Sequence, residues 1–116
     1  MAENYREDLS PRKKEILKYI EENLDEIEED YPGNKEIAKE LGCSKNTVRQ
    51  ALKEAAIGGE DYAQEIMMLD SVKRKSLAVE YLRRNGDYGK VEKIKNIWDK
   101  EKREEIIEET LNKYMS

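Results

Sequence analysis

Polar side chains that hydrogen-bond well to bases and phosphates gather in one short stretch of the chain, residues 44–53. Arginine presents a fork of donors that matches guanine, and asparagine or glutamine can pair a donor and an acceptor with adenine. Lysine binds phosphate oxygens as a compact charge. The residues predicted to read base edges are Lys45, Asn46, Thr47, Arg49, Gln50 and Lys53.

Apolar residues around this stretch recur at helical spacing. Ile37 and Leu41 lie four residues apart and share one face of a first helix. Val48, Ala51 and Leu52 share one face of a second helix. Small residues complete the predicted core, one where the two helices approach closely and others in the turn between them. The full set of predicted core residues is Ile37, Ala38, Leu41, Gly42, Cys43, Val48, Ala51 and Leu52.

The link between the two helices has the composition of a tight turn. Gly42 can adopt the left-handed conformation that ends a helix. Cys43 is predicted to be a small buried hydrophobe, and Ser44 can cap the next helix with its hydroxyl. This pattern predicts a helix-turn-helix, whose second helix enters the major groove by its N-terminal end. The residues predicted to contact phosphates are Asn34, Lys35, Lys39 and Ser44.

Two runs of sequence resemble known families with this motif. SKNTVRQAL resembles the recognition helix of GntR-type regulators, and SPRKKEILKYIEEN with YPGNKEIAKELG resembles the N-terminal domain of SOS repressors. The resemblance covers roughly Ser10 to Ala56 and implies a domain that binds DNA. Both families continue into a β-hairpin wing. Here Gly58 and Gly59, a predicted hinge, precede EDYAQEIMMLD, which lacks alternating apolar residues, so we expect no wing.

Charge is unevenly distributed along the chain. The whole chain carries −5 at neutral pH, but residues 34–57 hold five basic and three acidic side chains, a net +2. Residues 1–33 hold five basic and eleven acidic side chains. Phosphate contacts dominate non-specific affinity. An acidic protein with one basic segment should therefore bind DNA weakly in general and prefer its own site.

The sequence indicates an all-α fold, a three-helix helix-turn-helix domain followed by a C-terminal helical hairpin. Residues 1–9 are predicted to form a flexible tail, residues 10–57 the DNA-binding domain, and residues 58–116 a helical oligomerisation or packing region.

Local signals place some of the helix ends. Ser10 and Pro11 suit the cap and first residue of a helix that runs to about Asp30. Asp70 and Ser71 suit the start of another helix, which leaves open whether the region after Gly59 holds one long helix or two.

The C-terminal half carries further apolar stripes. A single recognition helix contacts only a few base pairs, so such domains bind as dimers to half-sites about one helical turn apart. We therefore predict a homodimer held by residues 60–115. The alternative is that this half folds back on the DNA-binding domain as additional core.

Several kinds of chemistry are missing from the sequence. Histidine is absent, and Cys43 is the single cysteine. Catalysis by histidine and a structural zinc site are therefore excluded, and we expect no enzymatic activity, no metal and no cofactor. No apolar run is long enough to span a membrane, and the N-terminus is polar. We expect a cytoplasmic protein, associated with the nucleoid through DNA, with no membrane partner.

These features predict a transcription regulator that binds double-stranded DNA sequence-specifically as a homodimer. Two alternatives remain open. One is a DNA-recognition subunit of a viral packaging machine, since small terminase subunits pair a helix-turn-helix with a helical oligomerisation segment. The other is a protein-interaction module that kept the fold, which the overall acidity favours.

Overall fold

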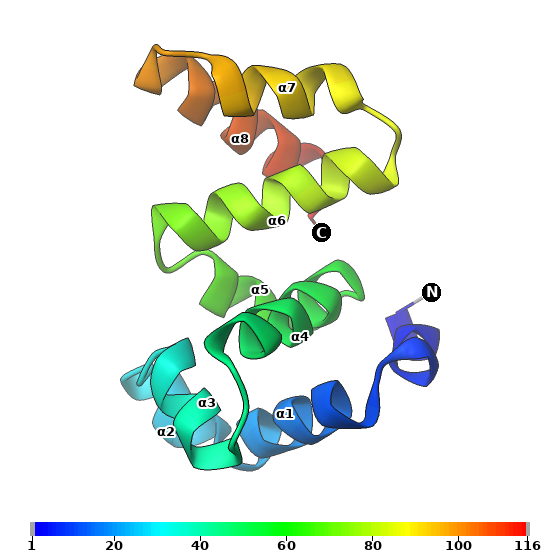
Figure 1. The fold of residues 1–116 in the computed structure, drawn as a ribbon, viewed down its shortest axis with the longest axis vertical. Helices are drawn as coiled ribbons and strands as arrows, with labels where there is room; N and C mark the ends of the chain where they lie inside the picture. Colours follow the sequence, from blue (N-terminus) through cyan, green and yellow to red (C-terminus); the bar gives the residue numbers. More distant parts are fainter. Residues whose placement is uncertain (1, 116) are drawn as a thin grey trace. The chain divides into compact units, whose positions relative to one another are not determined.

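The structure is a computed structural model that describes residues 2–115. The regular elements in this range are all helical, which confirms the predicted all-α class (Figure 1). In chain order they are η1 (Ala2–Asp8, a 3-10 helix), α1 (Pro11–Glu22), α2 (Leu24–Glu29), α3 (Asn34–Leu41), α4 (Lys45–Ile57), α5 (Asp61–Met67), α6 (Ser71–Arg84), α7 (Tyr88–Asn96) and α8 (Lys100–Tyr114). Within residues 2–115 no strand follows α4, and α5 stands where a wing would begin. None of the described helices combines the length and the apolar character that a bilayer span requires.

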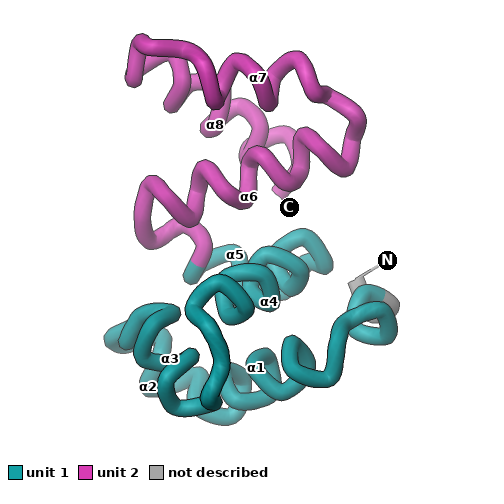
Figure 2. Tube along the Cα trace, in the orientation of Figure 1, with its two compact units in different colours: residues 1–66 teal, residues 67–116 magenta. Residues whose placement is uncertain are grey.

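The chain divides into two compact units, residues 1–66 and residues 67–116 (Figure 2). The second unit therefore begins later than the boundary predicted after residue 57, because most of α5 belongs to the first unit. Gln64 Nε2 donates to the carbonyl oxygen of Ala56 over 3.0 Å, and Glu60 N donates to Ala55 O over 3.0 Å. These bonds make the link after α4 a hydrogen-bonded turn rather than the predicted hinge.

The first long helix begins as predicted but ends early. Ser10 caps α1 by accepting from Lys13 N over 3.3 Å, and Pro11 is its first residue. The predicted continuation to Asp30 is wrong, because the chain leaves helical geometry at Asn23 before α2 begins. The Asn23 side chain donates to the carbonyl oxygen of Tyr19 over 2.8 Å. Asparagine competes for backbone groups in this way, which weakens a helix from within.

The core of the first unit forms where α1 and α3 pack against α4. Ile16, Leu17 and Ile20 of α1 are fully buried. They are neighbours on one face because helical residues three and four positions apart lie together. From α4, Val48 and Leu52 are fully buried as well. Burial of each such side chain contributes about 1.5–3 kcal/mol, so α4 is held firmly between its two neighbours.

The N-terminal segment differs from the predicted flexible tail. Leu9 is buried, and the ring of Tyr5 lies against Gly58 at the end of α4. The guanidinium of Arg6 pairs with Glu21 of α1 and, over 3.4 Å, with Glu60. The aromatic ring and the cation of this segment thus contact residues that lie far away in the sequence, which a flexible tail would not do.

The second unit contains three helices, α6, α7 and α8, where the sequence predicted a hairpin of two. Two breaks separate them. Gly86 has φ of 75°, and Asp87 then caps α7 by accepting from Lys90 N over 3.3 Å. After α7 the chain runs extended, and Asp99 caps α8 by accepting from Glu101 N over 3.0 Å. The sequence left two possibilities open for the middle of its last helical segment, exposure to solvent or a kink near Asp99, and the second break lies at Asp99.

Apolar and polar contacts hold α6 against α8. Tyr81 stacks on Tyr114 with ring centroids 5.8 Å apart, and Arg74 pairs with Glu104 over 3.1 Å. Asp70 caps α6 by accepting from Lys73 N over 2.8 Å, so α5 and α6 are separate helices.

Candidate nucleic-acid interface

The turn between α3 and α4 has the predicted backbone geometry. Gly42 adopts φ 69° and ψ 39°, the left-handed conformation that terminates α3. Ser44 then caps α4, since its hydroxyl oxygen accepts from Thr47 N over 3.1 Å. The guanidinium of Arg12 in α1 donates to Leu41 O over 2.8 Å, which satisfies a carbonyl at the end of α3. The left-handed Gly42, the Ser44 cap and the hydrogen bond from Arg12 together stabilise the turn between α3 and α4.

The facing sides of α3 and α4 are buried largely as predicted. Ile37, Ala38, Val48, Ala51 and Leu52 are at most 3% exposed. Three other members of the predicted core lie nearer to the surface, because they belong to the turn and to its approach. These are Leu41 and Cys43, both half-buried, and Gly42, which is exposed. Cys43 is a free thiol rather than a fully buried hydrophobe.

The polar residues of α4 lie on the side away from this core. Ser44, Lys45 and Asn46 at its N-terminal end are exposed. Thr47, Arg49 and Gln50, one turn further on, are half-buried. The hydroxyls of Ser44 and Thr47 lie 2.8 Å apart in a hydrogen bond.

Arg49 is the most constrained of these side chains. Its Nη2 donates to Asn46 Oδ1, one turn earlier on α4. Its Nε is buried and has no hydrogen-bond partner within residues 2–115. Burying an unpaired donor costs about 1–3 kcal/mol, so a rotation that brings this nitrogen to an acceptor would be favourable.

Lys53 requires a correction. The sequence placed it among the base-reading residues because it lies outside the apolar positions predicted to form the buried face of the second helix. In the structure Lys53 is only 8% exposed. It belongs to the C-terminal half of α4, where Ala51, Leu52 and Ala55 are buried as well. The other residues that the sequence predicted to read bases all lie in the first two turns of the helix.

The residues predicted to hold phosphates separate into two groups. Lys35 and Lys39 are exposed and lie four residues apart, so they share one side of α3. Asn34 is half-buried, and its side-chain oxygen accepts from the hydroxyl of Tyr31. The two lysines can reach a phosphate freely, whereas the Asn34 oxygen already has a donor.

A second side of α3 is acidic. Glu36 and Glu40 line a hollow of about 290 Å³ together with Glu26 and Asp30 from α2 and its end. This concentration of carboxylates repels phosphate, so a nucleic acid would meet the first unit on its lysine side. Among the described residues, no group of three or more carboxylates or thiols is arranged to hold a metal ion.

Comparison with known proteins identifies no relative of this chain. No family model matches the sequence, and no curated protein or solved structure matches the chain. The function of this surface therefore has to be inferred from its own side chains.

Proposed function

We propose that this protein binds double-stranded DNA sequence-specifically through the first two turns of α4 and acts as a transcription regulator. The observation that carries the proposal is the polar face formed by Lys45, Asn46, Arg49 and Gln50 on a helix whose opposite side is buried. A major groove admits one helix, and these side-chain types match the donor and acceptor patterns of base edges there.

Positive charge near this face also supports an approach of DNA to the N-terminal end of α4. The N-terminus of α4 carries a partial positive charge from its free N–H groups, which favours a nearby phosphate. Lys35 and Lys39 on α3 add two exposed positive charges. In this arrangement α4 would read bases while α3 would bind the backbone, the division of labour typical of a helix-turn-helix.

One copy of α4 covers few base pairs, so we extend the proposal to a homodimer with two such helices. Its target would be an inverted repeat whose half-sites lie about one helical turn apart, roughly 34–36 Å.

Selection of bound duplexes from a random pool, followed by affinity measurement at fixed salt, tests the proposal. Arg49→Ala and Gln50→Ala should each weaken binding to the selected duplex by about tenfold or more, since one good base contact contributes about 1–3 kcal/mol. Lys18→Ala is the matched control, an exposed cation on α1 that should leave affinity unchanged. Parent-like binding by both α4 variants would reject the proposal.

Salt dependence separates backbone contacts from base contacts. Lys35→Ala with Lys39→Ala should weaken binding to every duplex alike and flatten the dependence on salt by about one unit of slope per lysine. Absence of any salt-dependent binding would instead favour a protein-interaction module. A solution mass of eight or more copies would favour the packaging subunit.

A further inference from the structure

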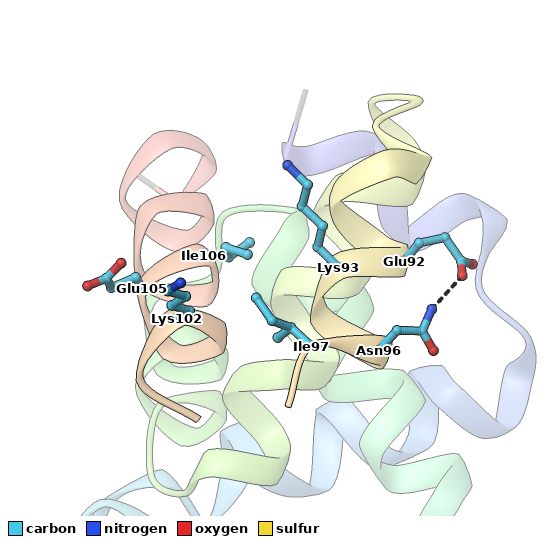
Figure 3. A pocket seen from close by; sticks show the side chains of 7 residues that line it. All are labelled: Glu92, Lys93, Asn96, Ile97, Lys102, Glu105 and Ile106. Carbon is cyan, nitrogen blue, oxygen red and sulfur yellow. Dashed lines mark hydrogen bonds between the residues drawn. The ribbon is translucent and has the colours of Figure 1, made fainter. Parts of the chain in front are cut away.

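The second unit has an apolar cleft between α7 and α8 that the proposed DNA site does not use. Figure 3 shows the seven residues that line it. The cleft is shallow and open to solvent, with a volume of about 610 Å³. Two half-buried side chains, Ile97 and Ile106, provide its apolar surface. Volumes in this range hold small organic groups in proteins, so the cleft is large enough for an indole ring.

An exposed aromatic residue lies beside this cleft. Trp98 directly follows Ile97 and is 98% exposed, the highest value among the exposed large apolar residues. Large exposed apolar groups at the edge of an apolar cleft are typical of an interaction surface, and tryptophan is among the residues that contribute most at interfaces.

The charges around the cleft indicate what kind of partner fits. Each helix contributes one acidic and one basic residue: Glu92 and Lys93 from α7, and Lys102 and Glu105 from α8. All four are exposed. Two carboxylates offset two lysines, so the rim offers DNA no net attraction. A strongly basic or strongly acidic peptide would gain no net attraction from a rim with balanced charge.

A second copy of the chain satisfies this pattern. A two-fold interface brings one surface against itself, so it requires a surface that is complementary to itself. Balanced charge provides this, because a lysine of one copy can face a glutamate of the other. We infer that the α7–α8 cleft is the dimer interface of this protein, with Trp98 of each copy inserted into the cleft of the other.

This inference rests on the homodimer in the proposed function but not on its DNA site, and it can be tested without DNA. Trp98 is the only tryptophan, so its fluorescence reports on this surface alone. At high concentration the full-length chain should have twice its mass of 13.7 kDa, and the emission should shift to shorter wavelength. Dilution should reverse both changes together. The mass of a single chain at high concentration, a ring of many copies, or a dimer whose tryptophan stays exposed to water would each overturn the inference.

Substitutions identify the surface. Trp98→Ala should raise the dimer dissociation constant by about tenfold or more, as expected for an interface anchor. Val72→Ala is the matched control, since Val72 is a 66% exposed apolar residue on α6, outside the cleft. An unchanged dissociation constant in Trp98→Ala would contradict the inference.

Charge-reversal variants of the cleft rim test the same interface without removing Trp98, in case Trp98→Ala disturbs folding. Lys93→Glu with Lys102→Glu makes the rim wholly acidic, and Glu92→Lys with Glu105→Lys makes it wholly basic. Each double variant should be monomeric alone, and an equimolar mixture should restore a dimer. If each double variant still dimerises alone, or if the mixture stays monomeric, the inference fails. Arg49→Ala should keep the dimer and bind the selected duplex about tenfold or more weakly, which separates failure of this inference from failure of the proposed function.

Discussion

Arg49 donates a hydrogen bond from Nη2 to Asn46 Oδ1, so the two side chains most suited to reading bases are linked to each other on the surface of α4. This bond orients the guanidinium along the helix. If both residues contact bases, this bond would couple their contributions to the affinity for DNA.

The first prediction follows from this bond. Asn46→Ala and Arg49→Ala should each reduce affinity for the selected duplex by about tenfold, and the double variant should lose clearly less than the product of the two effects, because residues in one hydrogen-bonded pair are not additive. Fluorescence anisotropy of a labelled duplex measures all four proteins of the cycle. Fully additive losses would show that the bond has no role in the complex.

The second prediction concerns the turn. Gly42→Ala should destabilise the first unit by about 1–2 kcal/mol, because a left-handed backbone is strained for residues with a Cβ. Apart from its two chain neighbours, no described residue has an atom within 4 Å of the position of that Cβ, so the strain comes from the backbone conformation. Gly42→Asn should retain most of the stability, since asparagine tolerates this conformation. Hydrogen exchange of α3 and α4 amides measures the effect. Equal protection in the alanine variant and the parent would contradict it.

The third prediction concerns the N-terminal segment. A Cβ on Gly58 would overlap the ring of Tyr5, although the right-handed backbone there suits alanine. Gly58→Ala should therefore cost about 1–3 kcal/mol through overpacking. In a Tyr5→Ala background the same substitution should be neutral or stabilise by about 0.4–1 kcal/mol. Hydrogen exchange across the first unit completes the cycle. A similar loss in both backgrounds would mean that Tyr5 does not pack there.

The fourth prediction concerns pH. Burial raises the pKa of Glu21, but hydrogen bonds from Arg6 and Tyr62 outweigh it, and the pKa lies below the ordinary value of 4.5. Tyr62 donates to this carboxylate over 2.9 Å. A carboxyl with a depressed folded pKa contributes stability that is present above its unfolded pKa and lost as pH falls through the folded pKa.

The parent should therefore exceed Glu21→Gln in free energy of unfolding by about 1 kcal/mol at neutral pH. The difference should shrink as pH falls below 4.5. Hydrogen exchange of α1 amides measures this difference in free energy of unfolding. Tryptophan fluorescence does not, since the tryptophan lies in the second unit. A difference that stays constant or grows in acid would contradict this account.

Local chemistry explains what the sequence predicted correctly. The start of α1 at Pro11, the left-handed Gly42 and the Ser44 cap each depend on a few neighbouring residues, and all three are confirmed. Helical spacing likewise placed Val48 and Leu52 in the core.

Contacts between distant residues explain the errors. The predicted tail overlooked the pairing of Arg6 with Glu21, and nothing near Arg6 in the sequence points to that partner. Lys53 was predicted to lie outside the apolar face of α4, but it is only 8% exposed in the second half of that helix. The break after α7 lies where the sequence allowed a kink, at Asp99, which is a good capping residue.

The central claim is that the first two turns of α4 contact the major groove. Nuclear magnetic resonance of the labelled full-length chain, titrated with its selected duplex, tests it most directly. The account predicts that the largest shifts appear at Lys45, Asn46 and Arg49, smaller ones at Lys35 and Lys39, and none in the acidic α2. Shifts confined to α7 and α8, or no shifts at saturating duplex, would contradict it.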